Sequence, residues 1–120
     1  MTRINLVEPE ELTDKHLLAE YREMLRLRHL QPRQKTIIPD SYRLGKGHVL
    51  FFANKGKWLL KRHKLLCEEM NSRGFTTNYT LDLSHWPLQA MNDWQPSFAE
   101  IEINKQRIET RKQVKSINPL

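Results

Sequence analysis

Cysteine is almost absent from this 120-residue sequence, which contains only Cys67. A single thiol excludes an internal disulfide and a metal site built from several cysteines, and it fits a reducing compartment. Long apolar runs are absent as well, because the longest covers only residues 49–53, far too few to cross a bilayer. No basic start leads into an apolar stretch of the kind found in signal peptides. We therefore expect a cytoplasmic protein with no membrane partner.

Repeats, low-complexity segments and convincing strand patterns are also missing. Hydrophobic residues make up 38% of the chain, which is enough for one compact core but not for two. Apolar residues recur at helical spacing in three stretches, namely residues 12–30, from 54 or 57 to 72, and 97–114. Residues 31–48 and 75–96 are expected to be irregular, and connections of that length are often functional. The sequence predicts a mainly α fold, a compact single domain over residues 1–120 with three helices and long irregular connections.

Short capping patterns mark the ends of these predicted helices. Pro9, with acidic neighbours, suits the first turn of the first helix. Gly74 stands just past the second helix, a position that glycine favours. Ser97 and Glu100 form a capping box, in which each side chain satisfies a free amide at the start of the third helix.

Basic residues outnumber acidic ones by 20 to 14, which gives a formal charge of +6. This balance suits a polyanionic partner, because phosphates neutralised by Lys or Arg release condensed counterions. A basic cluster runs along the second helix and comprises Lys55, Lys57, Lys61, Arg62 and Lys64. The cluster either tracks a DNA backbone or forms the solvated side of an amphipathic helix. Trp58, Trp86 and Trp94 are expected in the core rather than as stacking platforms for bases.

The first helix carries a polar stripe. Ala19, Arg22, Glu23 and Arg26 share one face, and His16 joins it two turns earlier. Two arginines beside one carboxylate could hold phosphates around it. The alternative interpretation is a solvated face with ion pairs inside the helix.

The N-terminus offers a second chemical candidate. Methionine before a small residue is commonly removed, which would expose the α-amine of Thr2. The pKa of an α-amine lies far below that of lysine, so a useful fraction is neutral and nucleophilic near neutral pH. Few proteins use their N-terminus in this way, so Thr2 alone decides nothing.

Together these residues resemble the bacteriophage endonuclease V family, the pyrimidine-dimer DNA glycosylases with abasic-site lyase activity. The opening MTRINL is similar to the family's start, and AEYRE at residues 19–23, with His16 before it and Arg26 after it, is similar to its first-helix motif. Residues 44–52, which read LGKGHVLFF, resemble its central loop, and residues 61–62 and 73–75 fit its second helix and the segment after that helix. The resemblance of the N-terminal residues is specific because Thr2 and Glu23 both fall at matching positions of the family pattern.

The resemblance implies a DNA repair mechanism. The Thr2 amine would attack the sugar of a damaged nucleotide, displace the base and form an imine, after which β-elimination would cut the strand. Glu23 would stabilise positive charge and assist proton transfer. The expected DNA-binding residues are Arg3, His16, Arg22, Arg26, Lys61 and Arg62. The implied partner is damaged double-stranded DNA, bound by a monomer without a metal or organic cofactor, in the host cytoplasm if the chain is phage-encoded.

The C-terminal part departs from the family pattern. Residues 115–120 do not carry the family's aromatic and basic tail. The resemblance therefore implies abasic-site cleavage more directly than recognition of a dimer. A related enzyme acting on other lesions and a non-catalytic basic nucleic-acid-binding module are the alternatives.

Overall fold

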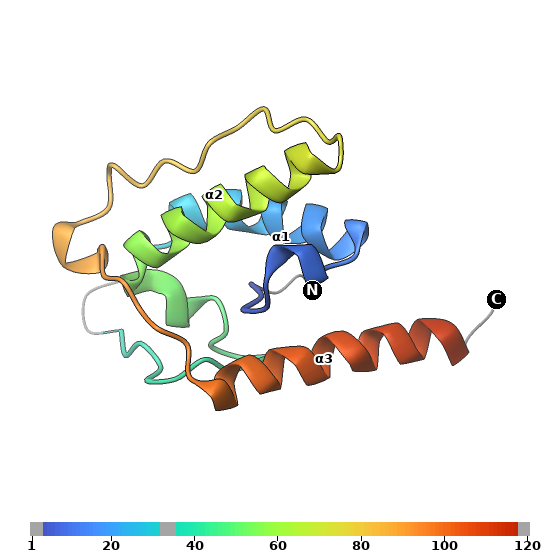
Figure 1. The fold of residues 1–120 in the computed structure, drawn as a ribbon. Coiled ribbons are helices and arrows are strands. Elements are labelled where there is room, and N and C mark those ends of the chain that lie inside the picture. The colour runs from blue at the N-terminus through green and yellow to red at the C-terminus, as the bar shows by residue number, and fades with distance from the viewer. Residues whose placement is uncertain (1–3, 32–35, 118–120) are drawn as a thin grey trace.

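The computed structural model describes residues 4–31 and 36–117 of the chain. Three α-helices dominate this part, α1 (Asp14–Arg26), α2 (Gly56–Ser72) and α3 (Phe98–Ile117) (Figure 1). Short 3-10 turns lie between them: η1 (Pro9–Glu11), η2 (Leu27–His29), η3 (Leu50–Asn54) and η4 (Leu88–Ala90). In the described ranges the only extended pairing is an isolated bridge between Lys55 and Met91. The predicted mainly α fold with three helices is confirmed.

The helices are arranged around the opening segment of the chain. α1 and α2 pack against each other, and the longer α3 runs along the lower edge in Figure 1. Residues 4–7 lie between the α1–α2 pair and α3, within the shared core. The first described residues therefore sit inside the molecule rather than along its surface.

The start of α1 differs from the prediction. Pro9 opens the separate turn η1, which Glu8 and Glu11 close with their own capping box. Leu12 is extended and interrupts the helical path. α1 begins two residues later, where the Thr13 hydroxyl accepts a hydrogen bond of 3.2 Å from the His16 amide. A good N-cap just downstream thus competes with proline for the helix start.

The predicted caps at the end of α2 and at the start of α3 are confirmed. At the end of α2, Gly74 has a φ of 87°, and the Phe75 amide donates to the Met70 carbonyl at 2.9 Å. At the start of α3, the Ser97 amide donates to the Glu100 carboxylate at 2.9 Å, and the Glu100 amide donates to the Ser97 hydroxyl at 3.1 Å. The connection over residues 75–96 is long and irregular as predicted, apart from η4.

Aromatic side chains build one end of the core. Phe52 stacks on Trp58 and meets Trp94 edge to face. Trp86 is buried, and its indole N–H donates to the Arg28 carbonyl at 3.0 Å. The expected core placement is confirmed for Trp86, while Trp58 and Trp94 are half-buried within the aromatic cluster.

One apolar residue of α2 lies outside the buried face of the helix. Leu60 is 37% exposed, whereas Leu59, Arg62 and Leu66 are buried. The buried face of the helix includes Arg62, so its centre is turned away from Leu60. A charged residue thus takes an inner position on α2, and an apolar one faces outward.

Candidate active site

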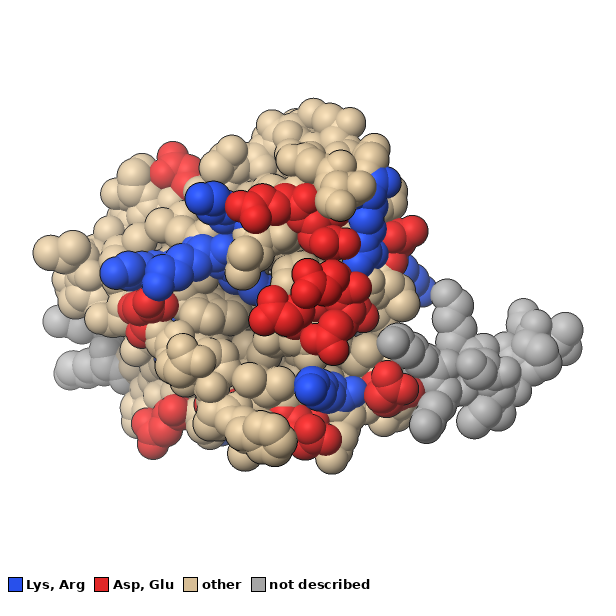
Figure 2. All heavy atoms as spheres, in the orientation of Figure 1, with Lys and Arg blue, Asp and Glu red and all other residues tan. Residues whose placement is uncertain are grey.

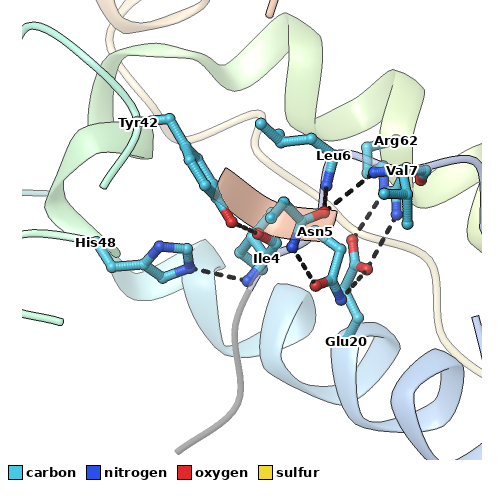
Figure 3. Close-up of polar contacts among 9 residues, drawn as sticks. Ile4, Asn5, Leu6, Val7, Glu20, Tyr42, His48 and Arg62 are labelled. Carbon is cyan, nitrogen blue, oxygen red and sulfur yellow. Dashed lines mark hydrogen bonds and ion pairs between the residues drawn. The ribbon is translucent and has the colours of Figure 1, made fainter. Parts of the chain in front are cut away.

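The opening segment is held at its first described residue by two buried side chains. The Ile4 amide donates to Nε2 of His48 at 2.9 Å, and the Ile4 carbonyl accepts from the Tyr42 hydroxyl at 2.9 Å (Figure 3). His48 and Tyr42 both belong to the connection between α1 and α2, and both are buried. Both polar groups of this peptide position are therefore fixed by side chains far along the chain.

A buried ion pair between α1 and α2 holds the next residues. Arg62 donates from Nε to Glu20 at 2.8 Å and from Nη2 to the same carboxylate at 3.1 Å. The remaining guanidinium nitrogen donates to the Val7 carbonyl at 2.6 Å, and the Asn5 amide group donates to Glu20 at 2.9 Å (Figure 3). Glu20 and Arg62 are 0% and 5% exposed. The ion pair is bidentate, and the other polar atoms of both side chains are also hydrogen-bonded. This geometry offsets the cost of removing two charges from water.

α3 contributes a third anchor through Asn104. Its side-chain oxygen accepts from the amides of Leu6 at 2.6 Å and Val7 at 3.1 Å. Its side-chain nitrogen donates to the Asn5 side chain at 2.8 Å. Residues 4–7 are thus bonded to all three helices and to the α1–α2 connection, although they form no regular secondary structure.

The predicted polar stripe belongs to the same helix, α1, whose Glu20 bonds this anchored segment. Glu23 follows Glu20 by three residues, about one helical turn, and its side chain is 16% exposed. Arg26 is 76% exposed and donates to Glu23 at 3.3 Å, while Arg22 is exposed. The predicted grouping of these three residues on α1 is observed. Glu23 is a shielded carboxylate with one arginine bonded to it and a second one nearby on the helix.

Two predicted site residues, Thr2 and Arg3, lie outside the described residues. His16 is half-buried at the first turn of α1, where its amide takes part in the N-cap. It precedes Glu20 by one turn and Glu23 by two, so it shares their side of the helix.

The basic cluster expected along α2 is divided by the fold. Arg62 is buried and bonded to Glu20 and Val7, which corrects the expected DNA contact: its guanidinium has no surface to offer. Lys61 is exposed and pairs with Asp93 on the connection that precedes α3. Of the two residues taken from this cluster as DNA contacts, only Lys61 lies on the surface.

Lys55 is the second buried cation of that cluster. Its Nζ donates to the Phe51 carbonyl at 3.0 Å and to the Asn54 side chain at 2.9 Å, and it lies 3.7 Å from the centroid of the Phe51 ring. Burial lowers the pKa of Lys55, and the nearby Glu100 carboxylate acts in the opposite direction. A lysine with a lowered pKa is a better nucleophile, but this one is enclosed by aromatic side chains.

His63 and Cys67 are adjacent in the α1–α2 interface. His63 stacks on Tyr21 with ring centroids 5.2 Å apart, and its Nδ1 lies 3.7 Å from the sulfur of Cys67. Burial lowers the pKa of His63. Burial, with a smaller contribution from Glu68, raises the pKa of the Cys67 thiol, which favours the unreactive protonated form. His63 is thus a core histidine.

The face shown in Figure 2 is unsuited to a polyanion. Acidic side chains gather near its centre, and the basic ones lie mainly to the sides of this acidic group. A groove of about 600 Å³ between η1 and α3 is lined by Glu11, Glu102 and Glu109, together with Lys105. Phosphates would be repelled here, so a DNA-binding surface has to involve another part of the molecule, such as the arginines of α1.

Several anchoring residues were not predicted from the sequence. Asn104 lies on the same stripe of α3 as Ile101 and Ile108, and Glu20 lies between Leu17 and Met24 on α1. A polar residue on an apolar helical stripe was the available signal, because such a residue needs a buried partner. Nothing in the sequence indicates which partner it has.

Among residues 4–31 and 36–117, no group of three or more His, Cys, Asp or Glu is placed to hold a metal ion. Within the same ranges, no helix has the length and apolar character needed to cross a membrane.

Comparison with protein families identifies a matching family. The family model described as pyrimidine dimer DNA glycosylase matches residues 1–83. This range includes α1, the connection that supplies His48, and all of α2. It ends before α3, which supplies the Asn104 anchor.

Proposed function

The chain belongs to the pyrimidine dimer DNA glycosylase family, whose members are DNA repair glycosylases with abasic-site lyase activity, and on that premise we propose that it cuts damaged DNA through an imine on the α-amine of Thr2. The observation that carries this proposal is the fixed placement of residues 4–7 against α1, the helix that presents Glu23. An immobile opening segment beside a shielded carboxylate is what an N-terminal nucleophile requires.

Covalent geometry limits where such a nucleophile can be. Two residues span at most about 7 Å, so the nitrogen of residue 2 stays within that reach of the Ile4 nitrogen. The Ile4 nitrogen is itself fixed by His48. The amine is thus limited to a short distance from a fixed backbone atom, without any need to bury a lysine.

The proposed chemistry has two stages. The neutral amine attacks C1′ of the damaged nucleotide, the bond from C1′ to the base breaks, and the base leaves with its bonding electrons and a proton. Opening of the sugar ring gives an imine to the protein. Loss of a proton from C2′ then expels the 3′ phosphate by β-elimination, and hydrolysis of the imine releases the amine. At an existing abasic site the amine condenses with the sugar aldehyde, releasing water.

The α1 side chains supply the electrostatics of this scheme. Glu23, shielded from water, stabilises the positive charge on the sugar or imine and assists the proton transfers. Arg22 and Arg26 hold phosphates flanking the lesion, and Arg3 does so beside the nucleophile. His16 supports the site from the preceding turns of α1. Lys61 remains a predicted contact to the DNA backbone, made by exchanging Asp93 for a phosphate.

Trapping the imine tests the proposal. Borohydride reduction on a duplex with one abasic site should give a covalent adduct that peptide mapping assigns to residue 2. Lys55 is the internal amine to watch, because its pKa is lowered. An adduct at Lys55, or no adduct, would reject the proposed nucleophile. Mass spectrometry of the mature protein should show that Met1 is absent, since an N-terminal methionine would turn the Thr2 nitrogen into an amide.

Replacing Glu23 tests the second half of the mechanism. Glu23→Gln keeps the shape and removes the charge, so strand cleavage should fall about 10²- to 10⁴-fold while DNA binding is retained. Glu109→Gln, a change at an exposed carboxylate of α3, is the matched control and should cut at the normal rate. Equal cleavage by the Glu23→Gln protein and the unmodified enzyme would remove Glu23 from the mechanism. A panel of duplexes with pyrimidine dimers, abasic sites and other lesions would establish the preferred substrate.

A further inference from the structure

The contact between the opening segment and the α1–α2 connection holds both polar groups of Ile4. The Ile4 amide donates to His48 and the Ile4 carbonyl accepts from Tyr42, each at 2.9 Å. The two rings also meet edge to face, with centroids 5.3 Å apart. We call this pair of side chains the Ile4 brace (Figure 3).

The hydrogen bonds fix the protonation state of His48. A backbone amide can only donate, so Nε2 has to be the bare, accepting nitrogen. Nδ1 then carries the proton and donates to the Arg43 carbonyl at 2.8 Å. The imidazole is neutral and buried, and both of its nitrogens are engaged by the chain itself, which leaves it no proton to exchange with a substrate. His48 therefore acts on the chain rather than on a reacting group.

The brace holds a different residue from the other anchors. Asn104 and the Glu20–Arg62 pair hold residues 5–7 and at the same time tie the three helices together. His48 and Tyr42 hold Ile4, which is the anchored residue nearest to the N-terminus. Since two residues span at most about 7 Å, a shift of Ile4 passes directly to the nitrogen of residue 2.

We propose that the Ile4 brace positions the imine-forming amine, with His48 as a positioning residue for the reaction. The inference rests on the proposed function. An attacking atom has to lie about 3–3.5 Å from its target, and an error of about 1 Å can cost 100-fold in rate. Loss of the brace should therefore slow imine formation much more than it weakens DNA binding, because the phosphate-binding side chains of α1 do not depend on it and only Arg3 adjoins it.

Two substitutions at His48 distinguish the loss of its hydrogen bond to Ile4 from a general loss of packing. In His48→Asn the side-chain amide reaches only the position of Nδ1, so the contact to Arg43 can persist and the acceptor for Ile4 is lost. In His48→Gln the side chain is one carbon longer, and its oxygen can reach the position of Nε2. His63→Leu is the control, because it removes another buried imidazole, one that contacts Tyr21 and Cys67 instead of Ile4.

The measurement is the single-turnover rate of borohydride trapping on an abasic duplex, with the dissociation constant measured in parallel. We expect His48→Asn to slow trapping at least tenfold with a much smaller change in affinity, His48→Gln to recover most of the rate, and His63→Leu to trap normally. Tyr42→Phe, which deletes only the hydroxyl on the Ile4 carbonyl, should slow trapping as well and provides the test if His48→Asn does not fold.

The outcomes separate this inference from the function on which it rests. If the unmodified enzyme gives no adduct at residue 2, the proposed function fails. If it gives one and folded His48→Asn or Tyr42→Phe traps at the same rate, the brace is overturned. A rate loss shared equally by His63→Leu, or one accompanied by an equal loss of affinity, also contradicts a positioning role.

Discussion

The Glu20–Arg62 pair shows what a single buried contact does in this protein. Both side chains are withdrawn from water, and together they bond α1, α2, Asn5 and Val7. Charges in such a place have lost their hydration, so each depends on the other for compensation. Removing one partner costs far more than the pair itself contributes.

Arg62→Met should therefore lower the free energy of unfolding by about 3–5 kcal/mol. The substitution leaves the Glu20 charge buried and the Val7 carbonyl without its donor. Adding Glu20→Leu should restore part of the loss, because no unpaired charge then remains. Urea unfolding of the two variants measures both effects. A cost below about 1 kcal/mol for the single substitution would mean that water reaches Glu20.

His63 gives stability a dependence on pH. Burial lowers the pKa of His63 from its ordinary value of 6.5, so the folded protein holds this imidazole neutral where the unfolded chain protonates it. Above the ordinary pKa the imidazole is neutral in both states, and burial of His63 has no cost that depends on pH. As the pH falls below the ordinary pKa, the unfolded chain takes up the proton first, so the free energy of unfolding decreases by at most about 1.4 kcal/mol per pH unit.

His63→Leu should consequently flatten the fall in the free energy of unfolding between pH 7 and pH 5.5. Urea unfolding at both values gives the comparison. His29→Gln, a change at an exposed histidine, should keep the dependence of the unmodified protein. An unchanged fall in the His63→Leu protein would assign the acid sensitivity to other groups.

At the scale of elements, the connection between α1 and α2 matters more than its irregular form suggests. It supplies Tyr42 and His48 to the buried network, and Gly47 immediately precedes His48. Gly47 has a φ of 87°, a conformation that other residues adopt only with strain, and an added Cβ would lie 3.3 Å from the Pro39 side chain. The turn at Gly47 thus sets the direction from which His48 enters the core.

Gly47→Ala should lower the free energy of unfolding by about 1–2 kcal/mol through the strained backbone and should slow imine trapping by displacing His48. Gly74→Ala is a close match, since that glycine also has a φ of 87° but ends α2, and an added Cβ there meets nothing within 4 Å. It should lose comparable stability and trap normally. Equal trapping rates in the two variants would show that the Gly47 turn does not influence the reaction.

At the scale of the whole molecule, the net charge of +6 is unevenly distributed. Acidic side chains occupy the centre of one face, whereas α1 carries the exposed Arg22 and Arg26. DNA affinity should fall with salt according to the number of phosphates contacted rather than the net charge.

Arg22→Ala and Arg26→Ala should each reduce the slope of log affinity against log salt by about 1. Lys105→Ala removes the same charge from the acidic groove and should leave the slope unchanged. Binding titrations on an abasic duplex from low to moderate salt provide the measurement. A slope that responds to Lys105 and not to the two arginines would place the DNA at the groove between η1 and α3 instead of at α1.

Local signals in the sequence determined the helices and most of their ends. Gly74 and the pair of Ser97 and Glu100 act within a few residues of the chain, so their effect does not depend on the rest of the fold. Thr13 was missed as a cap because Pro9 offered a competing start nearby. The grouping of Arg22, Glu23 and Arg26 also followed from the sequence, because helical periodicity alone places them together.

Only the tertiary structure decided how the opening segment is held. Asn104 bonds Leu6 across 98 positions of the chain, and His48 bonds Ile4 across 44. Such contacts depend on the directions in which helices and connections pack, which no local pattern encodes. The same packing turned Arg62 inward, although it is a charged residue within a run of basic residues that is typical of a helix surface. The sequence determined that Arg22, Glu23 and Arg26 share one helix, and packing determined that residues 4–7 are fixed against that helix through Glu20.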